Sequence, residues 1–283
     1  MDRTVRFEKM AFSDRYSRLD RSEILRFLFY PRPEEDWEAH RPEGVEEVTI
    51  PVAPGIRLGG RFFFSRPGAP AILFFHGNGE IVADYTDLGQ VYQSMGIHFM
   101  PVDYRGYGRS SGTPTISAML HDAHSVLEFS LNRLRQSREQ GPLIVMGRSL
   151  GSGPALELAA AYGEWVDGLI IESGFSRTGP LLERLGLPRE MLDVEEEEDG
   201  LDHLGKIGRF RKETLVIHGQ EDEIIPFQDG LELYEASGAS QKRLLRIPGA
   251  GHNDLLLRAA REYLQAIQEL VDSVLAKTRV RAA

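Results

Sequence analysis

The chain has 283 residues, of which 41% are hydrophobic, so it is long enough to bury a substantial core within one domain. Its formal net charge of −10 argues against nucleic acid or an anionic membrane surface as the main partner. It contains no cysteine, which excludes disulfide bonds and thiol catalysis.

The N-terminal segment is charged and lacks the apolar core of a signal peptide. No stretch of the chain approaches about 20 uninterrupted apolar residues, so we expect a cytoplasmic protein without an integral membrane segment. Residues 1–44 are predicted to be an extension that packs on the body. Within them, Ile24 to Tyr30 have an amphipathic pattern that predicts a short helix lying on the body. A helix that contacts a membrane or a partner is the alternative.

From residue 45 onward, apolar runs alternate with segments of helical period, after an initial hairpin around Pro54 and Gly55. The eight predicted strands cover 45–52, 56–64, 71–75, 97–103, 142–146, 166–172, 214–217 and 244–247. The predicted helices cover 81–94, 116–134, 154–161, 230–236 and 254–276. This alternation predicts one α/β domain, residues 45–283, with a mostly parallel eight-stranded sheet flanked by helices on both faces.

Two features interrupt the pattern. Pro101 lies inside a predicted inner strand, where its missing N–H predicts a β-bulge. Residues 175–211 fall between two strands and predict a small lid insertion at the catalytic edge. They contain the acidic run Glu195 to Asp199, which we interpret as a solvated loop, because a metal site would need spaced ligands rather than a contiguous block.

Residues Gly147 to Gly151 have the sequence G-x-S-x-G and lie between an apolar strand and a helix, which is the context of a nucleophile elbow. The two glycines leave room in a turn so tight that side chains would collide with neighbouring backbone. Ser149 is therefore expected at the tip of the turn, in a strained conformation, with its hydroxyl exposed.

A base and an acid follow in the order that such an elbow requires. Asp222 and His252 each come just after a predicted strand, at the edge where ligands meet an open parallel sheet. We assign His252 as the base that accepts the Ser149 proton, and Asp222 as the acid that orients its imidazole. Three other carboxylates compete for the role of the acid: Glu172, Glu221 and Glu223.

The turn from His76 to Glu80 follows the third strand and is placed to supply a main-chain N–H to an oxyanion. We expect the N–H groups of Asn78 and Leu150 to form the oxyanion hole, with Leu150 favoured by its position at a helix start. His76 itself is expected to fix its loop by hydrogen bonds. The glycine-rich segment 103–112 lacks a phosphate-binding lysine, so it predicts a turn beneath the oxyanion side of the site.

The remaining candidates predict neither a metal nor a cofactor. His121 and His124 lie three positions apart on a predicted helix, but without a third ligand we interpret them as surface residues. Arg148, the residue before the nucleophile, has two equal interpretations. It either pairs with a carboxylate beside the site or only covers the surface.

Five segments together resemble the α/β-hydrolase superfamily: HGNGE at 76–80, DYRGYGRSSG at 103–112, GRSLGSG at 147–153, HGQEDEIIP at 218–226 and GAGHND at 249–254. Within it, the chain is most similar to bacterial relatives of the depalmitoylase-like α/β-hydrolase-domain serine hydrolases. The resemblance covers roughly residues 45–276 and implies an α/β-hydrolase fold with Ser149 as nucleophile, Asp222 as acid and His252 as base. The eukaryotic depalmitoylases have a cysteine-rich, lipidated N-terminus, so the lack of cysteine gives no support to membrane recruitment by that route.

These inferences predict a cofactor-free serine hydrolase that cleaves small-molecule esters or thioesters through an acyl-enzyme. Two alternatives stay open. One is an acyl-aminoacyl peptidase or oligopeptidase, which shares the order of the triad, and the other is a non-catalytic binding protein on the same fold. A dehalogenase is disfavoured, because its nucleophile would be an aspartate at position 149.

Overall fold

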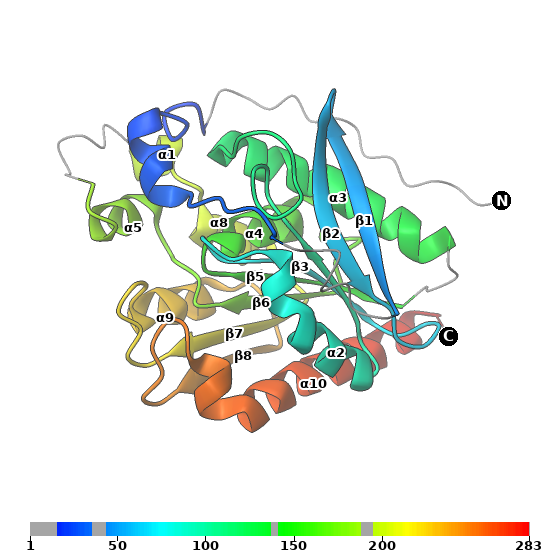
Figure 1. Cartoon of the computed structure of the whole chain (residues 1–283). Helices are drawn as coiled ribbons and strands as arrows, with labels where there is room; N and C mark the ends of the chain where they lie inside the picture. Colours follow the sequence, from blue (N-terminus) through cyan, green and yellow to red (C-terminus); the bar gives the residue numbers. More distant parts are fainter. Residues whose placement is uncertain (1–15, 36–43, 137–140, 188–194, 283) are drawn as a thin grey trace.

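The computed structural model describes residues 16–35, 44–136, 141–187 and 195–282 (Figure 1). Its strands form one eight-stranded sheet in the order β1-β2-β4-β3-β5-β6-β7-β8. β1 pairs antiparallel with β2, and β2 with β4, whereas the pairs from β4 to β8 along the sheet are parallel. The predicted fold class, a mostly parallel eight-stranded α/β sheet, is confirmed.

The strands are β1 Val45–Ala53, β2 Ile56–Phe63, β3 Ala71–Phe75, β4 His98–Val102, β5 Leu143–Arg148, β6 Gly168–Glu172, β7 Glu213–Gly219 and β8 Lys242–Ile247. The α-helices are α1 Ser22–Leu28, α2 Thr86–Ser94, α3 Ile116–Gln136, α4 Ser152–Ala161, α5 Thr178–Arg184, α7 Glu196–Asp199, α8 His203–Arg209, α9 Phe227–Ala236 and α10 Leu255–Ala282. Two short 3-10 helices, η2 Val82–Tyr85 and η3 Ser149–Gly151, precede α2 and α4.

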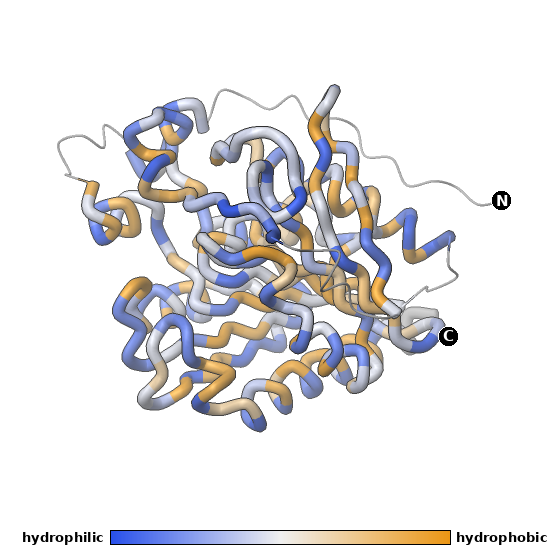
Figure 2. The backbone as a smooth tube through the Cα atoms, viewed as in Figure 1, coloured by the Kyte–Doolittle hydropathy of each residue, from blue (hydrophilic) through white to orange (hydrophobic). Residues whose placement is uncertain are grey.

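Helices cover both faces of the sheet (Figure 1). α2 and α10 pack on one face, and α3, α4 and α9 pack on the other, where α8 contacts α4 and α9. Strand residues alternate between the two apolar layers: Val145 joins the cluster that includes α4, and Ile144 and Met146 join the cluster that includes α10. Figure 2 shows hydrophobic residues concentrated in the central strands. Burial on both faces is the reason that the inner strands are continuous apolar runs.

The hairpin of β1 and β2 turns at Pro54 and Gly55, as predicted, with Gly55 at a φ of 73° that favours glycine. Its register is irregular between Pro51 and Ala53 of β1. The hairpin therefore forms the antiparallel edge of an otherwise parallel sheet.

The bulge predicted at Pro101 is wrong. Pro101 pairs with Phe74 in an unbroken parallel register between β3 and β4. The N–H of Asp103, two residues further on, donates at 2.9 Å to the main-chain oxygen of Gly59 in β2, which lies on the other side of β4 from β3. Because N–H groups alternate in direction along a strand, the missing N–H of Pro101 faces β2 and costs that ladder one hydrogen bond without distorting β4.

The short helix predicted within Ile24 to Tyr30 is present as α1, with Ile24 and Leu28 buried against the body. α1 contacts α5, which comes from the insertion between β6 and β7, and the two helices lie side by side in Figure 1. Within the described ranges, no helix has both the length and the apolar composition needed to cross a bilayer.

The interpretation of the acidic run as a solvated loop is wrong, because Glu196–Asp199 form α7 and two of its carboxylates have partners. Glu196 accepts the main-chain N–H groups of Thr178 and Gly179, at 3.0 and 2.8 Å, at the start of α5. Asp199 is 7% exposed and pairs with Arg18 at 3.3 Å. These carboxylates fix the insertion to its surroundings.

Candidate active site

Ser149 lies directly after β5, as the first residue of η3, and its φ of 52° is in the left-handed region. This conformation is strained for a residue other than glycine, and such strain gathers at functional sites. A Cβ at Gly147 would lie 2.1 Å from the Gly151 carbonyl oxygen, and a Cβ at Gly151 would lie 2.1 Å from that of Phe75. Close approach of the backbone therefore requires both glycines of the elbow.

His252 bridges Ser149 and Asp222 through its two ring nitrogens. Its Nε2 lies 3.0 Å from Ser149 Oγ, and its Nδ1 lies 2.8 Å from Asp222 Oδ2. The three residues follow β5, β7 and β8, at one edge of the sheet, and all three are buried. In this geometry an imidazole can accept a serine proton while a carboxylate orients it.

Main-chain groups also hold Asp222. Its Oδ1 accepts the N–H groups of Ile224 and Ile225 at 3.0 and 2.8 Å, and His218 Nε2 lies 3.4 Å from Oδ2. Burial opposes ionisation, but hydrogen bonds from two histidines and a main-chain amide outweigh it and hold the pKa of the Asp222 carboxyl well below its ordinary value. Asp222 is thus a fixed anion against the imidazole.

The competing carboxylates lie elsewhere. Glu172 accepts a hydrogen bond from the Tyr263 hydroxyl and pairs with Arg148 at 3.4 Å, and burial raises its pKa. Glu221 and Glu223 are exposed, and Glu223 accepts the main-chain N–H of His252 at 3.4 Å. Among these carboxylates, Asp222 is the one whose oxygen lies on the imidazole.

Arg148 pairs with carboxylates beside the site, which decides between its two interpretations. Its guanidinium lies 3.1 Å from Glu80 and 3.4 Å from Glu172. It also donates to the main-chain oxygen of His252 at 3.2 Å and to Asn253 Oδ1 at 2.9 Å. Burial disfavours the cation, but the surrounding acidic groups outweigh it and raise the pKa of Arg148. A buried cation therefore joins the elbow to the histidine loop.

The turn from His76 to Glu80 lies beside the elbow, and we call it the oxyanion turn because the sequence predicts that it supplies a donor to an oxyanion. Asn78 and Leu150 line the same cavity as Ser149 and His252. The Asn78 side chain accepts hydrogen bonds at its Oδ1 from the Tyr107 hydroxyl at 2.7 Å and from the Tyr30 N–H at 2.8 Å. The side chain of Asn78 is thus used to fix the turn.

The segment 103–112 lies against the oxyanion turn, where the sequence predicted a supporting turn. The Tyr104 hydroxyl donates to His76 O at 2.6 Å, and Asp103 Oδ1 accepts the Val82 N–H at 2.9 Å. His76 donates from Nδ1 to Gly77 O at 2.8 Å, and its Nε2 lies 3.4 Å from Asp103. His76 therefore has a role within its loop, as expected.

A cavity of about 230 Å³ reaches Ser149 and His252. Its lining includes five apolar side chains, here called the apolar wall: Leu28 of α1, Leu181 of α5, Leu185 just after α5, and Ile224 and Ile225 of the turn after β7. Glu80, Arg148 and Asn253 add polar groups to the lining. The cavity can therefore hold a ligand that has both apolar and polar parts.

His121 is a surface residue as expected, because its side chain is more than one-third exposed. The same interpretation of His124 is wrong. The His124 side chain is 11% exposed, with Nδ1 at 2.7 Å from the Tyr162 hydroxyl and Nε2 at 3.6 Å from Glu157. Glu157 in turn pairs with the buried Lys206 at 2.6 Å. These groups join α3, α4 and α8 on the side of the sheet away from α10.

Sequence reasoning missed Glu80 and Tyr263 as partners in the site. Glu80 Oε2 accepts the Gly77 N–H at 2.6 Å and also binds the Tyr85 hydroxyl. The sequence contains one signal for the charge network around them: Arg148 and Glu172 are opposite charges at the ends of two apolar strands. In the structure these two residues occupy paired positions in the register of β5 and β6. No spacing rule connects Glu80 or Tyr263 to this pair.

The chain is similar to known proteins in sequence and in fold. Residues 67–192 match the family described as serine aminopeptidase, S33. The mouse alpha/beta hydrolase domain-containing protein 17C is 31% identical over 245 residues, which cover 83% of this chain and 71% of that protein. The Caenorhabditis elegans alpha/beta hydrolase domain-containing protein aho-3 is 31% identical over 218 residues, and the match spans 75% of this chain and 60% of that protein.

A solved esterase from Thermogutta terrifontis shares the fold, with a TM-score of 0.61 and 20% identity over 81% of this chain and 99% of that one. The mouse relative, at 31% identity over 83% of this chain and 71% of its own length, places the chain in the α/β-hydrolase superfamily. Within it, the chain belongs to the family of the alpha/beta hydrolase domain-containing proteins 17. The resemblance inferred from the five sequence segments is confirmed.

Proposed function

We propose that this protein is a serine hydrolase that cleaves carboxylic esters or thioesters, with Ser149 as nucleophile, His252 as general base and Asp222 as the residue that orients the base. The observation that carries the proposal is the pair of hydrogen bonds of His252, 3.0 Å to Ser149 Oγ and 2.8 Å to Asp222 Oδ2. A serine hydroxyl is a weak nucleophile at neutral pH, and an adjacent imidazole is what activates it.

In the acylation step, Ser149 Oγ attacks the carbonyl carbon of the substrate while its proton passes to His252 Nε2. The N–H groups of Leu150 and Asn78 hold the oxyanion, and a donor of this kind contributes about 2.7–4 kcal/mol to transition-state stabilisation. The imidazolium then gives its proton to the departing alcohol or thiol. Water, deprotonated by His252, hydrolyses the acyl-enzyme and releases the acid and free Ser149.

The lining of the cavity supports an acyl substrate. The apolar wall includes side chains of α1 and α5, so we propose that residues 175–211 act as the lid of one catalytic domain, residues 45–283, with part of the N-terminal extension beside them. An apolar acyl chain would contact the apolar wall, and the departing group would lie near Glu80, Arg148 or Asn253.

A peptidase is the second candidate, because the matched family is described as a serine aminopeptidase. An aminopeptidase needs a carboxylate that is free to bind a substrate ammonium group. Glu80 lines the cavity, but its oxygens already bind Arg148, the Gly77 N–H and the Tyr85 hydroxyl. This engagement favours the ester and thioester reaction.

The test is hydrolysis of p-nitrophenyl esters from acetate to palmitate, matched acyl-thioesters and aminoacyl p-nitroanilides by wild type, Ser149→Ala and Ser111→Ala. Ser111 lies exposed in the glycine-rich segment and is the control serine. We expect ester and thioester turnover in wild type and Ser111→Ala and its loss in Ser149→Ala. Turnover retained by Ser149→Ala would contradict the proposal, and a preference for the anilides would establish the peptidase instead.

A further inference from the structure

Residues 30–34, here called the strap, cross the oxyanion turn. The Tyr30 N–H donates to Asn78 Oδ1 and to the Tyr107 hydroxyl, both at 2.8 Å. Arg32 Nε donates to the Gly79 carbonyl oxygen at 2.8 Å, and the same guanidinium pairs with Asp84 just after the turn. The strap therefore contacts the turn on both a side chain and a main-chain oxygen.

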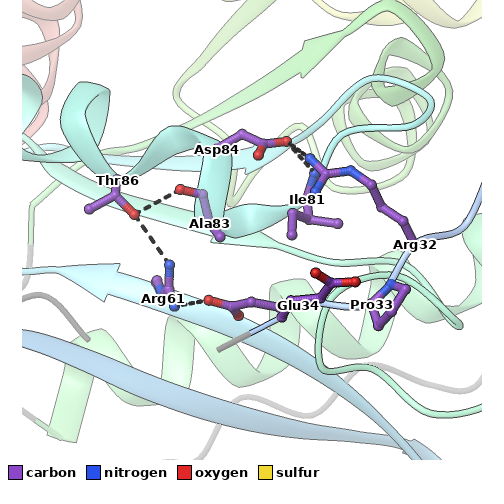
Figure 3. Close-up of a pocket in the computed structure, with 9 residues that line it drawn as sticks. Arg32, Pro33, Glu34, Arg61, Ile81, Ala83, Asp84 and Thr86 are labelled. Carbon is purple, nitrogen blue, oxygen red and sulfur yellow. Dashed lines mark hydrogen bonds and ion pairs between the residues drawn. The ribbon is translucent and has the colours of Figure 1, made fainter. Parts of the chain in front are cut away.

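The strap is itself anchored to the body. Arg32 O accepts the Gly108 N–H at 2.8 Å, and the Glu34 N–H donates to Gly108 O at 3.2 Å. Glu34 also pairs with Arg61, whose side chain is 2% exposed and which binds Glu47 at 2.7 Å. Figure 3 shows Arg32 extending toward Asp84, whereas Glu34 lies against Arg61. Pro33 joins Arg32 to Glu34. These bonds tie the strap to β2 and to the glycine-rich segment.

The oxyanion turn needs external support because of its composition. It contains Gly77 and Gly79, and Gly79 has a φ of 75°. Glycine leaves the main chain many alternative conformations, so such a turn does not by itself fix the direction of its N–H groups. Oxyanion stabilisation depends on donors held at 2.7–3.1 Å from the developing charge.

We propose that Arg32 is a positioning residue: by binding Gly79 O and Asp84, it holds the oxyanion turn in the geometry that stabilises the transition state. The extension before the hydrolase sheet is then part of the catalytic architecture, although it touches no reacting atom. This proposal rests on the proposed function. It predicts a loss in kcat with little change in KM, because the oxyanion forms only in the transition state.

The experiment compares Arg32→Ala, Arg32→Lys and the control Arg243→Ala on the best p-nitrophenyl ester. Arg243 lies on β8, its side chain is 44% exposed, as is that of Arg32, and it pairs with Glu269 of α10 rather than with the turn. We expect at least a tenfold fall in kcat for Arg32→Ala, KM within twofold, partial recovery in Arg32→Lys and no change in Arg243→Ala. A trifluoromethyl ketone, whose adduct carries an oxyanion, should bind Arg32→Ala more weakly by the same factor as kcat falls.

A second variant, Tyr107→Phe, removes the hydroxyl that donates to Asn78 Oδ1 and keeps the ring. It should lower kcat in the same way, which keeps the test decisive if Arg32→Ala folds poorly. Unchanged kcat in folded Arg32→Ala and Tyr107→Phe, with wild type active and Ser149→Ala inactive, would overturn the positioning role alone. Absence of wild-type turnover on every substrate would overturn the proposed function as well.

Discussion

The guanidinium of Arg148 donates a hydrogen bond, at 3.2 Å, to the main-chain oxygen of His252, which lies 104 residues further along the chain. Arg148 precedes the proposed nucleophile, and His252 is the proposed base, so one buried cation connects the two loops that carry them. The same cation pairs with both Glu80 and Glu172. The elbow and the histidine loop are therefore coupled by charge as well as by packing.

Replacing this cation is expected to be costly. In Arg148→Met, two carboxylates lose the cation that pairs with them, and breaking a buried ion pair costs about 3–5 kcal/mol of unfolding free energy. Turnover should fall too, because the histidine loop loses a donor. Urea unfolding measures the first effect. The control is Arg177→Met, an arginine 45% exposed that pairs with Glu232 and should cost at most about 1 kcal/mol. Equal losses in both variants would contradict this account of Arg148.

The elbow glycines predict a steric effect. In Gly151→Ala the new Cβ would lie 2.1 Å from Phe75 O, so the turn must move and the variant should lose about 1–3 kcal/mol or more, together with its activity. Gly163→Ala is the matched control, because the atom nearest its Cβ is at 3.4 Å. Thermal unfolding of the two variants separates the cases. A Gly151→Ala protein with wild-type stability and turnover would be incompatible with the elbow geometry.

His203 predicts a dependence of stability on pH. It is 1% exposed, and burial next to Lys206 lowers its pKa from 6.5 to about 3. Below pH 6.5 the unfolded chain therefore binds a proton that the folded protein does not bind. The contribution of His203 to the free energy of unfolding is thus fully present above pH 6.5 and is lost as pH falls. At pH 5 the loss is about 2 kcal/mol.

Urea unfolding at pH 7.5 and pH 5 tests this in wild type and His203→Asn. The asparagine amide does not titrate and can donate to Phe175 O, as His203 Nδ1 does at 2.8 Å. Wild type should lose about 2 kcal/mol more than the variant between the two values of pH. If both proteins lose the same amount, His203 is not the group responsible.

The apolar wall of the cavity predicts control of acyl length. Leu185 lies just after α5 and lines the cavity, so Leu185→Trp should shorten the acyl chain that gives the highest kcat/KM. Hydrolysis of the acetate ester should change little, since a short acyl group does not reach the added ring. Leu264→Trp, on α10 at the other face of the sheet, is the control. A chain-length profile that is the same in all three proteins would show that the acyl group lies elsewhere.

Much of the fold could be predicted from the sequence because its signals are local. The inner strands are buried on both faces and appear as apolar runs, and the elbow requires Gly147 and Gly151 within five residues. Ser149, Asp222 and His252 could be proposed together because the parallel strands before them end at one edge of the sheet.

The remaining features depend on contacts between distant segments, which leave no spacing in the sequence. The bond from the Tyr30 N–H to Asn78 joins positions 48 residues apart, and nothing in either segment predicts it. The sequence predicts a distortion at Pro101 because it does not reveal which strand lies on each side of β4. The sequence of the acidic run predicts a solvated loop because it does not reveal the partner of Glu196. That partner is the start of α5, which lies 18 residues earlier in the chain.

Fluorophosphonate labelling followed by peptide mass spectrometry tests the central claim most directly, since it requires no knowledge of the natural substrate. We predict one label on Ser149 of the wild-type protein, at least a hundredfold slower labelling in His252→Gln and none in Ser149→Ala. A label on any other residue, or a rate unaffected by His252→Gln, would contradict the proposal that these side chains form one catalytic unit.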